Sequence, residues 1–149
     1  MAGVSVTVRD DRVGAALERL SHAVGNLEPA LDEIGNFAVS QILAGFDGER
    51  DPYNVPWQAS DRAITEGGKT LQDQGHLRDS YTHLVEGDSV FVGSNIVYAR
   101  AHQFGREEIN LPPRKMLPLT DDGEVDLPPH WIDEIEGTLG DHLLGALNA

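Results

Sequence analysis

Apolar residues recur along the first third of the chain with two different periods. Over residues 4–8 they alternate with small polar residues, which is the pattern of a strand with one buried face. Over residues 13–24 they recur every three or four positions, as on one face of a helix that Asp10 or Asp11 can cap. A second helical stripe covers residues 29–48. The short connection between the two stripes predicts an antiparallel pair of helices.

The second half of the chain changes period several times. Residues 77–85 and 89–93 read as two strands of a hairpin. Residues 94–104 have the spacing of a short helix of about three turns. Residues 106–120 carry prolines that forbid a helix, so they are expected to be extended chain or an edge strand. Apolar residues at four-residue steps from Trp131 to Leu147 predict a last amphipathic helix, which Pro128-Pro129 introduces.

These elements together predict an α+β fold. A small antiparallel sheet is expected to pack against two N-terminal helices, a short middle helix and a C-terminal helix. The length of 149 residues fits a single domain spanning 1–149. Residues 47–75 form a long polar stretch that is rich in Gly, Pro and Asp and has no sustained period. Loops of this length inside a compact domain are uncommon and often functional.

Two large aromatic residues, Tyr53 and Trp57, lie in this loop next to Pro52 and Pro56. Large rings on a loop need something to cover them. Trp57 therefore either folds back onto its own domain or anchors a subunit contact, where Trp and Tyr are favoured. The two possibilities are compatible with each other.

The charge of the chain restricts its partners. Eleven Lys and Arg against 25 Asp and Glu give a formal net charge of −14. A surface this negative repels phosphates, so sequence-specific nucleic-acid binding is not expected. An acidic composition of this kind has three possible explanations. The protein works at high salt, where charge repulsion is screened, it lines a channel through which DNA slides without adhering, or it is an ordinary acidic protein. No apolar run is long enough for a membrane span, and the N-terminus lacks the features of a secretion signal.

Candidate catalytic chemistry is sparse. The chain has no cysteine, which excludes disulfides, thiolate metal sites and a cysteine nucleophile. None of the six histidines forms the His-x-x-x-His pair that places two imidazoles on one helical face. A metal-dependent hydrolase built on His76, Asp79, His83 and His102 is kept as an alternative. Serine-nucleophile and phosphate-loop motifs are absent from the sequence, so we expect no enzyme, no metal site and no cofactor.

Six short sequence elements nevertheless follow one another in an order that is informative about the family of the chain. They are the helical N-terminal half ending at Phe46, the loop Asp51-Pro52 with Pro56-Trp57, the segment Gly75–Ser80 with its Gly-x-Leu-x-x-Ser-like pattern, the strand VFVGSN, the segment Tyr98–Gly105, and Leu111–Leu117 with its Pro-x-Arg element. In this order the chain resembles the tailed-phage virion morphogenesis or tail completion family found in Mu-like phages.

This resemblance implies a structural protein of a tailed virus. Such proteins act in tail completion or head–tail joining, as a tail terminator or a neck protein. They form rings, commonly hexameric, through which DNA passes without sequence-specific binding. The expected partners are copies of the chain itself, a neighbouring neck or connector protein and the tail tube protein, with no membrane. The expected location is the virion, at the neck or tail end, and the host cytoplasm during assembly.

Subunits in a ring touch through two different patches. We expect these patches to include residues of the 47–75 loop and of the proline-bearing segment, namely Tyr53, Pro56, Trp57, Ile109, Leu111, Pro113 and Arg114. An extended edge at Glu108–Leu111 is expected to add a strand to a neighbour's sheet. A tail assembly chaperone that does not enter the virion is the other alternative.

Overall fold

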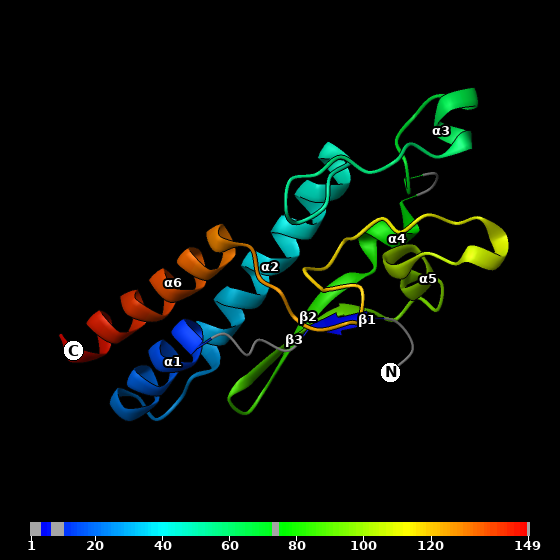
Figure 1. The fold of residues 1–149 in the computed structure, drawn as a ribbon. Helices are drawn as coiled ribbons and strands as arrows, with labels where there is room; N and C mark the ends of the chain where they lie inside the picture. The colour runs from blue at the N-terminus through cyan, green and yellow to red at the C-terminus, as the bar shows by residue number, and fades with distance from the viewer. Residues whose placement is uncertain (1–3, 7–10, 73–74, 149) are drawn as a thin grey trace.

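The computed structural model describes residues 4–6, 11–72 and 75–148. In chain order the elements are β1 (Val4–Val6), α1 (Asp11–Ala23), α2 (Glu28–Gly48), α3 (Asp61–Glu66), α4 (His76–Asp79), β2 (Tyr81–Glu86), β3 (Ser89–Ser94), α5 (Ala99–Phe104), the 3-10 turn η1 (Glu107–Ile109) and α6 (Pro129–Leu147). Figure 1 shows helices and a small sheet arranged as the predicted α+β fold, which is therefore confirmed. The rest of the predicted first strand, residues 7–8, and the possible cap Asp10 lie outside the described residues.

The sheet is antiparallel with strand order β1-β3-β2. The predicted hairpin is confirmed: Tyr81 lies opposite Ser94, and Glu86 lies opposite Ser89 at the turn. Val90 and Val92 of β3 are buried. Because α2 packs across β2 and β3, this apolar side of the hairpin is covered by the longest helix of the chain.

The helix α2 approaches the sheet most closely at Gly35. A Cβ atom built at this position would lie only 2.2 Å from Cδ2 of His83 on β2. The same imidazole contacts Asp32 one turn earlier, with Nε2 at 2.7 Å from a carboxylate oxygen. Glycine is the one residue that leaves room for the ring, so Gly35 sets the distance between helix and sheet.

The C-terminal helix α6 packs against both α1 and α2. Arg12 of α1 contacts Asp133 at 3.0 Å and Glu136 at 2.9 Å, and His142 of α6 contacts Glu33 of α2 at 2.7 Å. The expectation that the two N-terminal helices pack on each other as an antiparallel pair is wrong, because α1 packs mainly on α6. Sequence proximity favours α2, whereas the ion pairs of Arg12 with Asp133 and Glu136 join α1 to α6.

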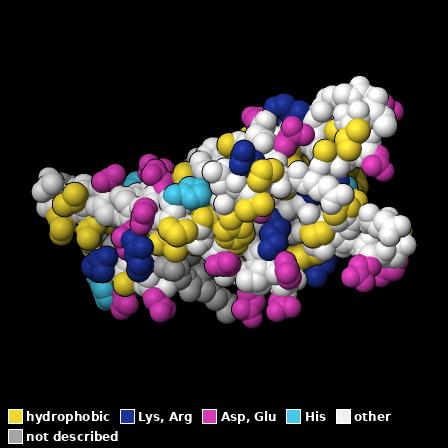
Figure 2. Space-filling model, turned by 45° about the horizontal axis from the view of Figure 1, so that its top comes forward, with side chains coloured by type: hydrophobic (Ala, Val, Ile, Leu, Met, Phe, Trp, Pro, Cys, Tyr) yellow, Lys and Arg dark blue, Asp and Glu magenta, His cyan; other side chains and the backbone are white. Residues whose placement is uncertain are grey.

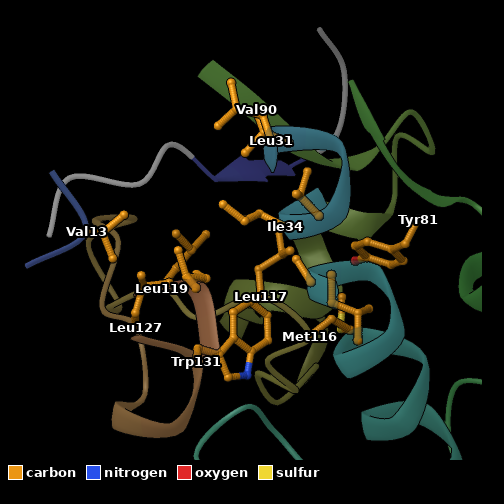
Figure 3. Close-up of a cluster of buried hydrophobic side chains, with 14 of the residues drawn as sticks. Val13, Leu31, Ile34, Tyr81, Val90, Met116, Leu117, Leu119, Leu127 and Trp131 are labelled. Atoms are coloured by element: carbon orange, nitrogen blue, oxygen red, sulfur yellow. The ribbon is translucent and has the colours of Figure 1, made fainter. Parts of the chain in front are cut away.

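One cluster of apolar side chains joins these elements. Figure 3 shows Leu117 and Leu119 lying close to Trp131 of α6 and Ile34 of α2. The ring of Trp131 also meets that of Phe37 edge-on, with centroids 5.7 Å apart. The aperiodic segment before α6 therefore contributes core residues, and its backbone is held against the helices.

Two predicted boundaries are wrong. The strand expected from residue 77 begins at Tyr81, because residues 76–79 form the helical turn α4 after Gly75, whose φ of 76° is left-handed. The middle helix expected from residue 94 begins at Ala99. Ser94 is the last residue of β3, where its hydroxyl contacts that of Ser80 at 2.6 Å.

The expectation of an extended edge at Glu108–Leu111 is also wrong. Residues 107–109 form the turn η1, and Asn110 follows with a left-handed φ of 53°. The backbones of Arg106 and Leu111 pair with each other and close this loop on itself. Figure 1 shows the tip projecting at the right-hand end of the molecule. A closed tip offers no free strand edge to a neighbour.

Among the helices in the described residues, none is both long enough and apolar enough to cross a membrane.

Candidate functional site

Two irregular segments lie against each other beside α5. The linker, residues 49–60, follows α2, and the strap, residues 106–127, connects α5 with α6. All seven sequence-predicted interface residues lie in these two segments, at positions 53–57 of the linker and 109–114 of the strap. The strap leaves α5 at Gly105, whose φ is 74° and where a Cβ atom would lie 2.7 Å from the carbonyl oxygen of Leu111. Only glycine fits this turn.

Gln103 of α5 holds the strap. Its side chain is fully buried. The amide oxygen accepts hydrogen bonds from the backbone N–H groups of Met116 and Leu117, both at 2.9 Å. The amide nitrogen donates to the carbonyl oxygen of Leu117 at 3.0 Å. One side chain thus replaces the backbone partners that a strand would have supplied to the strap.

The aromatic residues of the linker fold back onto their own chain. Trp57 donates from Nε1 to the carbonyl oxygen of Lys115 at 2.9 Å, and its ring meets that of Phe46 with centroids 5.4 Å apart. Tyr53 donates from its hydroxyl to the carbonyl oxygen of Asp126 at 2.6 Å. Burial and the nearby carboxylates raise the pKa of Tyr53 to about 12. Both rings are half-buried, so each leaves only part of its surface for a neighbour.

The other predicted interface residues divide between surface and interior. Pro56 and Pro113 are exposed, and Ile109 at the tip of the strap is 62% exposed. Leu111 is half-buried. Arg114 is buried, and its Nε donates to the carbonyl oxygen of Gln58 at 2.7 Å. Burial lowers the pKa of Arg114, and Asp61 opposes that effect. The structure therefore gives Arg114, Trp57 and Tyr53 a role in joining the strap to the linker.

A pocket of about 380 Å³ opens between α3, α4, α5 and the strap. It brings together side chains that the sequence keeps far apart. Its basic side chains are Arg62, His76, His102 and Arg114, and its apolar side chains include Leu71, Leu77 and Leu111. We call this site the basic pocket. Four basic side chains in one hollow stand out on a chain with a net charge of −14.

His102 is expected to make stability depend on pH. Burial, and to a lesser extent Arg114, lowers its pKa from the ordinary value of 6.5. As the pH falls through 6.5, the unfolded chain therefore takes up a proton before the folded chain does. The stability that neutral His102 contributes is fully present above pH 6.5 and is lost as the pH falls toward the folded pKa. Wild type should lose more free energy of unfolding than His102→Gln between about pH 7.5 and pH 5.

Urea denaturation at a series of pH values measures this difference. The control is His22→Gln, because the side chain of His22 is 79% exposed and lies on α1. This control should follow wild type at every pH. Parallel curves for wild type and His102→Gln would contradict the prediction.

The residues of the hydrolase alternative are not assembled into one centre. His76 and His102 both line the basic pocket, whereas His83 is bound to Asp32 of α2. Asp79 lies 3.5 Å from the guanidinium of Arg78. Within residues 4–6, 11–72 and 75–148, no three His, Asp or Glu side chains are grouped so that they could hold a metal ion.

Sequence reasoning missed Gln103 and the basic pocket. A polar residue between the apolar positions of a short helix was the available signal for Gln103. No local signal marks the pocket, because its basic residues come from positions 62, 76, 102 and 114 and meet only in the folded chain.

The linker, the strap and the hairpin all lie in the part of the chain that the model of a known family matches. The model of the phage virion morphogenesis family matches residues 8–143. The chain belongs to the phage virion morphogenesis family. The resemblance inferred from the six sequence elements is thereby confirmed, and a role in phage tail or virion assembly follows from it. Members of such assemblies contact other virion proteins, so the context of this protein is a phage particle or its assembly.

A curated relative supports the same assignment. The chain is similar to the Mu-like prophage FluMu G protein 2 of Haemophilus influenzae, with 28% identity over 120 residues. The match covers 77% of this chain and 83% of the relative. No solved structure matches the chain significantly.

Proposed function

We propose that the protein is a structural component of a tailed virus that forms a ring, most simply a hexamer, at the head–tail junction or the tail end. The observation that carries this proposal is the match of the virion morphogenesis family over residues 8–143. In this role the protein completes the tail or joins it to a neck or connector protein, and it contacts the tail tube protein. It catalyses no reaction.

The surface of the chain supports a ring. Exposed apolar side chains lie at separate places, with Ile109 at the tip of the strap and Leu144 and Leu147 at the end of α6. Separate patches suit a heterologous contact, in which one patch meets a different patch on the next copy, and such contacts give a ring when the rotation between copies closes.

The charge supports the passage of DNA. On the face shown in Figure 2, acidic side chains are spread from one end of the molecule to the other. With a net charge of −14, a channel built from such subunits repels phosphates and lets DNA slide without sequence-specific binding.

The test uses virions of the virus that encodes this chain. We expect mass spectrometry of purified particles to detect the protein, and electron microscopy to show it as a ring at one end of the tail. A protein required for assembly but missing from purified particles is a tail assembly chaperone, and that result overturns the structural role. A monomer that is absent from particles and turns over a small molecule would overturn the proposal as a whole.

A further inference from the structure

The end of α6 carries apolar side chains with no described neighbour to cover them. Leu144 is 59% exposed and Leu147 is 67% exposed. Because they lie three residues apart, they share one side of the helix, and Asp141 precedes Leu144 by the same spacing. Asp141 is exposed as well. The side of α6 formed by Asp141, Leu144 and Leu147, which we call the α6 end, therefore combines a carboxylate with two leucines.

The charge of the α6 end comes from the carboxylate of Asp141 and from the end of the helix itself. The last turn of α6 contains no basic residue. The last carbonyl groups of a helix carry a partial negative charge, which a basic side chain or a partner can balance. A surface of this kind calls for a partner with basic groups and an apolar wall.

The basic pocket has both properties. Arg62 and Arg114 supply positive charge, His76 and His102 supply imidazole N–H donors, and leucines supply the wall. Arg62 is half-buried, and its guanidinium donates to the carbonyl oxygen of Lys69 at 2.8 Å, which holds it at the pocket. His76 is exposed at the rim. The pocket and the α6 end are thus complementary in charge and in polarity.

The two surfaces lie at opposite ends of the molecule. Figure 1 shows the C-terminal end of α6 at the far left, whereas α3, α4 and α5 lie at the right. Figure 2, which is turned about the horizontal axis, keeps this separation and shows hydrophobic side chains at the left-hand end. A chain cannot fill its own pocket across this distance, but a second copy can fill it from outside.

The tip of the strap is a weaker partner for the pocket. It also pairs carboxylates with an apolar residue, at Glu107, Glu108 and Ile109. However, it lies only two residues from Leu111, which lines the pocket itself. The tip and the pocket are therefore adjacent on the molecule, whereas the α6 end and the pocket lie at opposite ends of it.

We propose that the α6 end of one copy docks in the basic pocket of the next copy, so that the ring is built head to tail through this contact. This inference rests on the proposed function, because it names the two surfaces that meet in the ring. Leu144 and Leu147 pack on the leucines of the pocket, and Asp141 meets its basic groups.

Two variants test the contact, one on each surface. His76→Glu places a carboxylate at the rim of the pocket, and Leu144→Glu places one on the α6 end. Both residues are exposed in the single chain, so both variants should fold, which circular dichroism and urea denaturation verify. Light scattering coupled to size-exclusion chromatography then measures the mass of each species.

The expected result is specific to a head-to-tail contact. Wild type forms a multimer, and each variant alone runs at the monomer mass of 16.2 kDa. An equimolar mixture forms a species of two chains, because the intact pocket of Leu144→Glu receives the intact α6 end of His76→Glu. No third chain can add, since the remaining pocket and the remaining α6 end both carry the added carboxylate.

Matched controls and outcomes separate this inference from the proposed ring. His130→Glu and Leu84→Glu change exposed residues of the same kinds elsewhere and should retain the wild-type multimer. If His76→Glu or Leu144→Glu assembles like wild type, the docking is overturned while the ring stands on other contacts. If the mixture stays monomeric beside a multimeric wild type, the pairing of these two surfaces is overturned. A wild type that is monomeric at every concentration overturns the ring itself.

Discussion

Replacing Gln103 with leucine is expected to lower the free energy of unfolding by about 2 to 6 kcal/mol, because it leaves two buried backbone N–H groups without a partner. The substitution removes the acceptor of the N–H groups of Met116 and Leu117, whereas the carbonyl group of Leu117 keeps its hydrogen bond from the N–H group of Leu119. Each buried polar group without a partner costs about 1–3 kcal/mol. Since native domains are stable by only about 5–15 kcal/mol, this one change is expected to bring the chain close to unfolding.

Urea denaturation of the purified variant measures the effect of this substitution. The matched control is Gln58→Leu, because Gln58 is exposed and only its backbone carbonyl takes part in the contact with Arg114. That control should change stability by no more than about 0.5 kcal/mol. If Gln103→Leu is as stable as the control, the hydrogen bonds of Gln103 do not hold the strap.

The second large effect is expected at Phe46. This side chain is fully buried, and its ring lies 5.4 Å from that of Trp57 and 5.9 Å from that of Tyr81, centroid to centroid. Phe46→Ala removes the ring that joins α2, the linker and β2. Deletion of a buried phenylalanine costs about 3–5 kcal/mol through lost burial and the cavity left behind.

Thermal and urea unfolding measure the loss at Phe46. Ile64→Ala serves as the control, because Ile64 is 69% exposed on α3 and its truncation leaves no cavity. The fluorescence of Trp57 should also change in folded Phe46→Ala, since its ring loses a direct neighbour. Unchanged stability in Phe46→Ala would mean that the linker is held by its hydrogen bonds alone.

Elements with a sustained apolar period could be predicted from the sequence. The stripe of α2 and the alternation of the β2–β3 hairpin are local signals, and the structure confirms both elements. Their boundaries were less predictable, because tertiary contacts decide them. The spacing of residues 94–104, for example, predicts a helix that includes Ser94, but Ser94 is held in β3 by Tyr81 and Ser80.

The strap and the candidate interface were only partly predictable. Prolines correctly indicated that the strap has no long helix, but its partners come from Gln103, which is 13 residues away from Met116. Trp57 was recognised as a ring that needs cover, while the alternatives of self-packing and subunit contact could not be separated. Its contact with Lys115 across 58 residues shows that it packs on its own chain. No local rule predicts such distant pairs.

The junction of linker and strap has a consequence for how such proteins can diverge. Trp57 donates to a carbonyl of Lys115, Arg114 to one of Gln58, and Tyr53 to one of Asp126. Every acceptor is a peptide oxygen, which any amino acid at that position provides. The side chains at the acceptor positions can therefore change in charge or in size while these hydrogen bonds are kept. During evolution, the surface that contacts a new neighbour can therefore change its side chains while the junction of linker and strap beneath it is kept.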